Sequence, residues 1–139
     1  MAVLTLLDVN ITAAQSIIAG GTLANLSGEN RPRRGLAVQA NFTYVASSAT
    51  TVDAYVQTSL DGGATWIDII EFHFTTASAR KVANVNAGTS VTSEATPTDG
   101  SLGAGDVVDG ILGDQLRVKW VSVGTYGAGT SLVITAVPN

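Results

Sequence analysis

The sequence lacks cysteine and is poor in charged residues. Without cysteine the chain has no disulfide bond, no thiolate metal ligand and no cysteine nucleophile. Charged residues make up 13% of its 139 residues, whereas soluble domains carry roughly 25%. This length suits one domain. A surface with so little charge is typical of a protein that packs against copies of itself or a large partner, so we expect a homo-oligomer or a symmetric array.

Basic residues are the scarcer of the two kinds of charge. The net charge is −4, so we do not expect broad electrostatic binding to nucleic acid. No run of about 20 apolar residues occurs, so we expect no membrane-spanning segment. Three of the seven basic residues stand together as Arg31, Arg33 and Arg34 in ENRPRRG. This group is either a solvated loop or a contact with an acidic partner surface, and we choose it as the candidate partner-contact site.

An alternation of apolar and polar side chains dominates the chain after residue 35. It is clearest in the runs AVQANFTYV, TVDAYVQTS, LRVKWVSV and SLVITAV. Turn signals rich in glycine, asparagine, aspartate and proline separate the runs, and no segment has a capped helical stripe. We therefore predict an all-β chain with about seven or eight strands, folded as an antiparallel β-sandwich of the jelly-roll or immunoglobulin-like type.

Two stretches depart from this alternation. Residues 1–34 are predicted to form an early edge strand followed by an extended arm or loop, while residues 35–139 form the sandwich of a single structural domain. Residues 87–110 are a second loose stretch, rich in glycine, threonine and aspartate. Long loops in compact domains often carry function or make contacts.

The stretch SLDGGATW resembles the Asp-box, a hairpin-corner motif written Ser/Thr-x-Asp-x-Gly-x-Thr-Trp. Its fixed positions are filled by Ser59, Asp61, Gly63, Thr65 and Trp66. Asp-boxes are best known from sialidase-like propellers, where one sits at the corner of each blade. A propeller needs at least four blades of about 40–50 residues, which this chain cannot supply. We therefore predict a structural turn in which the Asp61 carboxylate accepts backbone N–H groups.

The titratable side chains give no catalytic pattern. His73 is the single histidine, and no nucleophile motif such as G-x-S-x-G accompanies it. Asp68 and Glu71 are three residues apart on one strand and should point to opposite faces, while Asp53 faces outward from another strand. We therefore expect no convergence of these groups, no enzymatic activity, no cofactor and no metal.

An acidic, glycine-rich stretch leaves one alternative open. It contains Asp99, Asp106, Asp109 and Asp114 in DGSLGAGDVVDGILGD. Calcium prefers such carboxylates, but the spacing fits neither an EF-hand loop nor a nonapeptide repeat. The aspartates are otherwise read as turn residues.

The order of features resembles a group of small β-sandwich proteins in the structural modules of tailed bacteriophages. The resemblance covers residues 37–137, and its most telling parts are DGGATW and LRVKW followed by a glycine- and threonine-rich corner. It implies a virion protein made in the host cytoplasm that binds the major capsid protein or other virion proteins. Our leading hypothesis is a decoration or cement protein that binds and stabilises the outer head surface.

Two other functions remain as alternatives. The first is a head–tail connector or tail component. The second is a carbohydrate-binding module, whose aromatic platform would come from Trp66, Trp120 or Tyr126. Trp120 alternates in phase with Val118, which favours a place in the core over a place in a platform.

Overall fold

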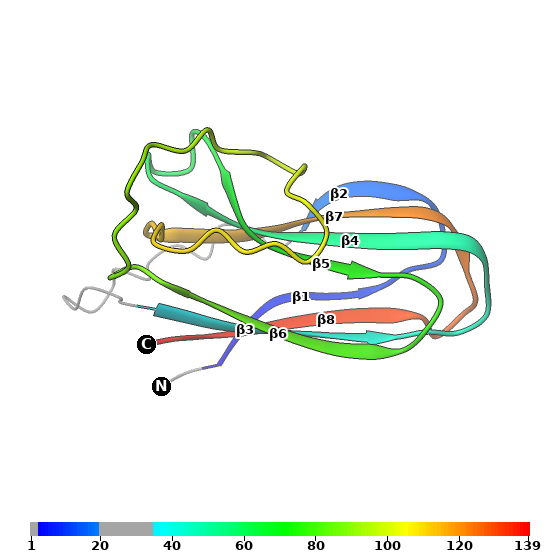
Figure 1. The fold of residues 1–139 in the computed structure, drawn as a ribbon. Coiled ribbons are helices and arrows are strands. Elements are labelled where there is room, and N and C mark those ends of the chain that lie inside the picture. The colour runs from blue at the N-terminus through cyan, green and yellow to red at the C-terminus, as the bar shows by residue number, and fades with distance from the viewer. Residues whose placement is uncertain (1–2, 20–34) are drawn as a thin grey trace.

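The computed structural model describes residues 3–19 and 35–139, with the backbone alone described for Ala19 and residues 47–50. Eight antiparallel strands form two four-stranded sheets that face each other (Figure 1). The first sheet has the order β1 (Leu4–Asn10), β8 (Ser131–Pro138), β3 (Gly35–Thr43), β6 (Ala79–Asn86). The second has the order β2 (Gln15–Ala19), β7 (Gln115–Tyr126), β4 (Ser47–Ser59), β5 (Ile67–Phe74). The predicted all-β sandwich is confirmed, and no helix in the described ranges is long and apolar enough to cross a membrane.

The strand pairing decides between the two predicted types of sandwich. Strand β1 pairs with β8, β2 with β7, β3 with β6 and β4 with β5. Such nested pairing arises when one long antiparallel ribbon rolls up into two sheets, which is the jelly-roll topology. Among the described strands, consecutive ones are neighbours only at β4 and β5, whereas an immunoglobulin-like sandwich contains several such hairpins.

The N-terminal segment contributes more to the sandwich than the sequence predicts. Residues 3–19 form two edge strands, one in each sheet, where the sequence predicted one strand followed by an arm. Strand β1 buries Leu6 and Leu7 in the core, and Ile11 follows them there. Burying these side chains removes apolar surface from water, which holds the segment against β7 and β8.

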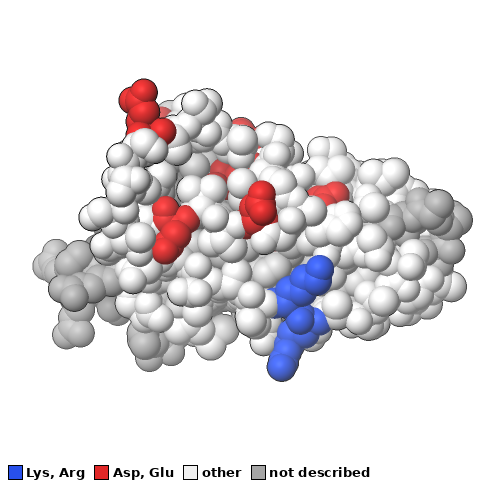
Figure 2. All heavy atoms as spheres, viewed as in Figure 1, with Lys and Arg blue, Asp and Glu red and all other residues white. Residues whose placement is uncertain are grey.

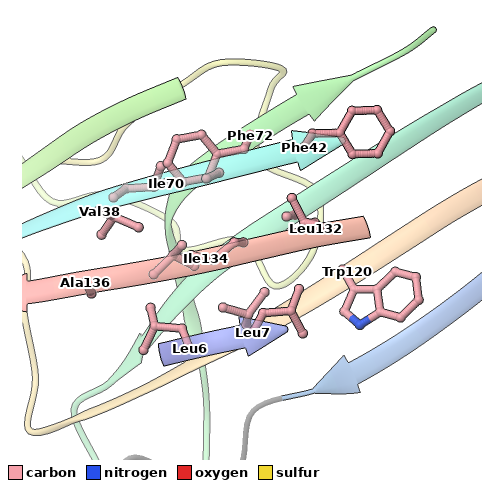
Figure 3. Close-up of a cluster of buried hydrophobic side chains, with 14 of the residues drawn as sticks. Leu6, Leu7, Val38, Phe42, Ile70, Phe72, Trp120, Leu132, Ile134 and Ala136 are labelled. Carbon is pink, nitrogen blue, oxygen red and sulfur yellow. The ribbon is translucent and has the colours of Figure 1, made fainter. Parts of the chain in front are cut away.

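The core lies between the sheets and consists of alternate side chains from both (Figure 3). Phe42 stacks on Phe74 with ring centroids 5.0 Å apart and meets the edge of Tyr126 at 5.8 Å. Trp120 is buried in this core, as its alternation with Val118 predicts. The inward residues of β3, β7 and β8 follow the two-residue period of the sequence without interruption.

The connection between β6 and β7, residues 87–114, lies along the edge of β5 and over the outer face of the second sheet (Figure 1). Its backbone continues the sheet for a short distance beyond β5. Glu71 N–H donates to Asp106 O (3.0 Å), and Val108 N–H donates to Ile69 O (2.8 Å). The connection therefore satisfies backbone groups that an open edge strand would leave to solvent or to another chain.

Candidate functional site

The predicted Asp-box residues lie in the corner between β4 and β5. The Ser59 hydroxyl donates to Asp61 Oδ1 (2.9 Å) and accepts the Gly63 N–H (2.8 Å). Thr65 donates its hydroxyl to Asp61 Oδ2 (2.6 Å) and its N–H to Oδ1 (2.8 Å). These bonds from Thr65, together with that from Ser59, lower the pKa of Asp61 to about 2. Gly63 has φ +95°, a conformation that favours glycine.

Trp66, the last residue of the motif, is half-buried outside the core. The Arg117 guanidinium carbon lies 4.4 Å from the centroid of its ring, a cation–π distance. Arg117 also donates from Nε to Gln57 Oε1 (2.6 Å). Through Arg117, the motif therefore contacts the outer faces of β4 and β7.

Asp68 fastens the connection 87–114 to β5. Its carboxylate accepts hydrogen bonds of 2.7–3.2 Å from two side chains and three successive backbone N–H groups, which belong to Gln57, Thr98, Gly100, Ser101 and Leu102. Burial alone raises the pKa of Asp68, but these hydrogen bonds outweigh it and the pKa is lowered. Asp68 is therefore a buried anion held by a ring of donors.

The prediction that Asp68 and Glu71 point to opposite faces is wrong. Gln57 pairs with Asp68 and Val56 with Ile70, so Ile69 has no partner in the ladder and forms a β-bulge. The extra residue changes the phase of the alternation. Both carboxylates therefore face outward, toward the connection 87–114.

The prediction that no titratable groups converge is also wrong. Asp53 on β4 lies directly opposite His73 on β5, and Glu71 lies two residues from His73 on the same outer face. His73 Nδ1 is 2.6 Å from Asp53 Oδ1. One oxygen of each carboxylate and one ring nitrogen lie within 4.8 Å of one another. The signal was present in the sequence: Val52, Ala54, Phe72 and Phe74 must face the core, which sends Asp53 and His73 to the same outer face.

Glu71 is the buried member of this group, with 2% of its surface exposed. Its Oε2 accepts the Gly105 N–H (2.6 Å), while its Oε1 has no hydrogen-bond partner. Burial, and then contact with the Asp53 carboxyl group, raises the pKa of Glu71 to about 7. We call Asp53, Glu71 and His73 the outer-face triad.

The acidic stretch does not form a calcium cage. Asp99 Oδ1 lies 3.4 Å from Arg117 and 3.6 Å from Lys119, and Asp109 accepts the N–H groups of Asn86 (2.6 Å) and Gly110 (2.9 Å). Within residues 3–19 and 35–139, one group of three or more histidine, aspartate or glutamate side chains lies close enough together to share a metal ion, and that group is the outer-face triad.

The structure places the aromatic candidates but does not describe the three arginines. Arg31, Arg33 and Arg34 lie outside the described residues. Of the aromatic residues considered for a sugar platform, Trp120 and Tyr126 are buried, and the Tyr126 hydroxyl donates to Thr75 O (2.8 Å). Neither presents a ring face to a ligand.

A shallow apolar groove lies on the outer face of the first sheet. It has a volume of about 260 Å³, and its lining includes Val3, Val82 and Val137 together with the polar Gln39 and Thr135, but no charged side chain. Val82 is 71% exposed. This groove was not predicted from the sequence, although Val82 breaks the alternation expected of an antiparallel sheet with a solvated face.

The acidic side chains of the connection 87–114 lie on another part of the surface, while Arg80 stands two residues from Val82 on the same face of β6. Figure 2 shows acidic groups spread over the part of the surface where the connection 87–114 lies, with a basic group below them. That connection carries several aspartates and Glu94 but no lysine or arginine.

A neutral groove thus lies on the outer face of one sheet, and a titratable triad lies on the outer face of the other. The chain matches no protein family model, no curated protein and no solved structure.

Proposed function

We propose that this protein is a structural component of a tailed-bacteriophage virion that binds the outer surface of the head and stabilises it. The proposal combines the sequence resemblance with the jelly-roll topology, which is common in viral capsid proteins and also occurs in lectins. Its action is binding without chemistry.

The apolar groove on the first sheet carries the proposal. An antiparallel sheet with one solvated face normally exposes polar side chains there, but Val3, Val82 and Val137 face outward here without a charge among the groove's lining residues. Exposed contiguous apolar surface is found at sites of contact with proteins, membranes or ligands, and we assign this groove to protein contact. The major capsid protein is its proposed partner.

The stabilising effect follows from linkage. A stable contact buries about 800 Å² on each partner, so a bound jelly roll covers far more of the head than the groove alone. Binding to the assembled head, and not to the separated capsid subunits, lowers the free energy of the assembled state. A copy that bridges neighbouring capsomers raises the barrier to head opening.

Deletion of the gene from the encoding phage tests this proposal. Heads should still assemble, but they should lose DNA at a lower temperature or after milder osmotic shock than parental heads. Addition of purified protein to the deleted heads should restore their resistance. Loss of tail joining, with unchanged head resistance, would instead identify a connector or tail component.

The groove is tested by a matched pair of substitutions in the added protein. Val82→Lys places a charge in the groove, and Val123→Lys places one at a valine 53% exposed on the second sheet. Surface substitutions of this kind change the free energy of unfolding by about 0.5 kcal/mol or less. Val82→Lys should fail to restore head resistance and Val123→Lys should succeed. Equal restoration by both would contradict binding through the groove.

A further inference from the structure

We propose that the outer-face triad of Asp53, Glu71 and His73 binds one divalent transition-metal ion. The sequence predicted no metal site, because the chain has one histidine and no cysteine. The structure supplies what that reasoning lacked, which is two carboxylates held beside the imidazole by the pairing of two strands.

The strand register makes this group rigid. Asp53 and His73 are cross-strand partners one pair in from the end of the β4–β5 ladder, and Glu71 lies on the same face of β5. Side chains at such positions project from the same surface with Cβ atoms about 4.5–5.5 Å apart across the strands. The three ligand atoms are thus brought together by the backbone and not by a loop.

The unpartnered oxygen of Glu71 points to a ligand. Glu71 is 2% exposed, and its Oε1 has no hydrogen-bond donor. The Glu71 side chain also contacts the Asp53 carboxyl group, so a cation at the triad would both satisfy this buried oxygen and offset the repulsion between the two carboxylates. The Gly105 N–H holds the other oxygen at 2.6 Å and so orients the carboxylate, as partners of metal ligands do.

The distances are close to those that a metal ion requires. Bonds of about 2.0–2.2 Å in a tetrahedral site separate the ligand atoms by about 3.3 Å. Asp53 Oδ1 and His73 Nδ1 are now 2.6 Å apart, and the three ligand atoms span at most 4.8 Å. Small side-chain rotations therefore suffice. The side chains of His73 and Asp53 are 34% and 25% exposed, so water can complete the coordination.

The ligand set selects the class of metal. Calcium takes six to eight oxygen ligands, more than two carboxylates beside an imidazole provide. Imidazole with carboxylates suits Zn²⁺ and its first-row neighbours. Zinc is the probe of choice because it tolerates a low coordination number and has no redox chemistry.

Titration of untagged protein with ZnCl₂ in a calorimeter tests the inference. We expect one ion bound per chain, and a rise in Tm of about 5 °C or more when free zinc exceeds its Kd about 100-fold. CaCl₂ at the same concentration should leave Tm unchanged. Absence of zinc binding heat together with an unchanged Tm would overturn the inference.

Substitutions locate the site. His73→Gln and Asp53→Asn should each weaken zinc binding at least about tenfold, the loss seen when even an outer partner of a metal ligand is removed. Asp114→Asn removes an exposed carboxylate outside the triad and should leave the Kd unchanged. Circular dichroism of the metal-free variants confirms that they fold. Zinc binding by folded His73→Gln and Asp53→Asn with the parental Kd would show that the triad is not the site.

Discussion

Replacing Asp68 by asparagine should release residues 100–102 of the connection 87–114 from β5. The substitution keeps the shape of the side chain but turns one carboxylate oxygen into an N–H₂ group. Asp68 Oδ2 now accepts the Thr98 hydroxyl (2.8 Å) and the N–H groups of Gly100 and Ser101 (2.8 and 3.0 Å). In the variant, the N–H₂ group at this position would face these same hydrogen-bond donors and could not accept hydrogen bonds from them.

The structure sets the size of the effect. A hydrogen bond to a charged group contributes about 1.5–3 kcal/mol, so loss of two of these bonds lowers the free energy of unfolding by about 3–6 kcal/mol. Release of the connection limits the loss, because water then solvates the freed N–H groups. The effect is still a large part of the about 5–15 kcal/mol that stabilises a typical domain.

The effect should depend on pH in a defined direction. The pKa of Asp68 is lowered in the folded protein, so its contribution is present above the unfolded value of about 3.9 and is lost as pH falls through the folded value. The difference in stability between parent and variant should therefore be largest at neutral pH and shrink below about pH 4. Asp61, whose pKa is about 2, is present in both proteins and cancels in the difference.

Urea unfolding followed by tryptophan fluorescence measures this difference at neutral and acidic pH. Hydrogen exchange adds a local readout, because the N–H groups of Gly100, Ser101 and Leu102 should lose protection in the variant. A difference below about 1 kcal/mol at pH 7, or one that grows in acid, would refute the argument.

Three further substitutions test the fold. Gly113→Ala should strongly destabilise the protein in thermal unfolding, because the new Cβ collides with the Ser59 backbone carbonyl. In Gly105→Ala the new Cβ meets no atom within 4 Å, so this variant should lose only the stability that corresponds to the strain of its positive φ. Equal Tm values for the two variants would contradict this packing. Phe42→Ala removes the ring that contacts Phe74 and Tyr126 and should lower the free energy of unfolding by about 3–5 kcal/mol. A loss under about 1 kcal/mol in urea unfolding would show that Phe42 is not a central core residue.

The fold was largely predictable because it depends on local patterns. Alternation placed Phe42, Trp120 and Ile134 in the core, and the glycines of the β4–β5 corner marked the turn. The short strand β2 was missed because it is an edge strand whose position depends on pairing with β7, at the far end of the sequence.

The outer-face triad could not be derived by counting residues from the turn. Near the turn Thr58 pairs with Ile67, and continuing that register would place Asp53 opposite Phe72. The bulge at Ile69 shifts the register by one residue and brings His73 opposite Asp53. A bulge of this kind has no strong sequence signal, so the requirement that the phenylalanines be buried was the better guide.

The copy number of the protein in purified virions tests the proposed function most directly. Quantitative mass spectrometry measures it relative to the major capsid protein and to the portal protein. A decoration protein should be present in a fixed ratio to the major capsid protein and should be lost from the head when Val82 is replaced by lysine. A copy number that matches the portal, or absence from the virion, would contradict the proposal.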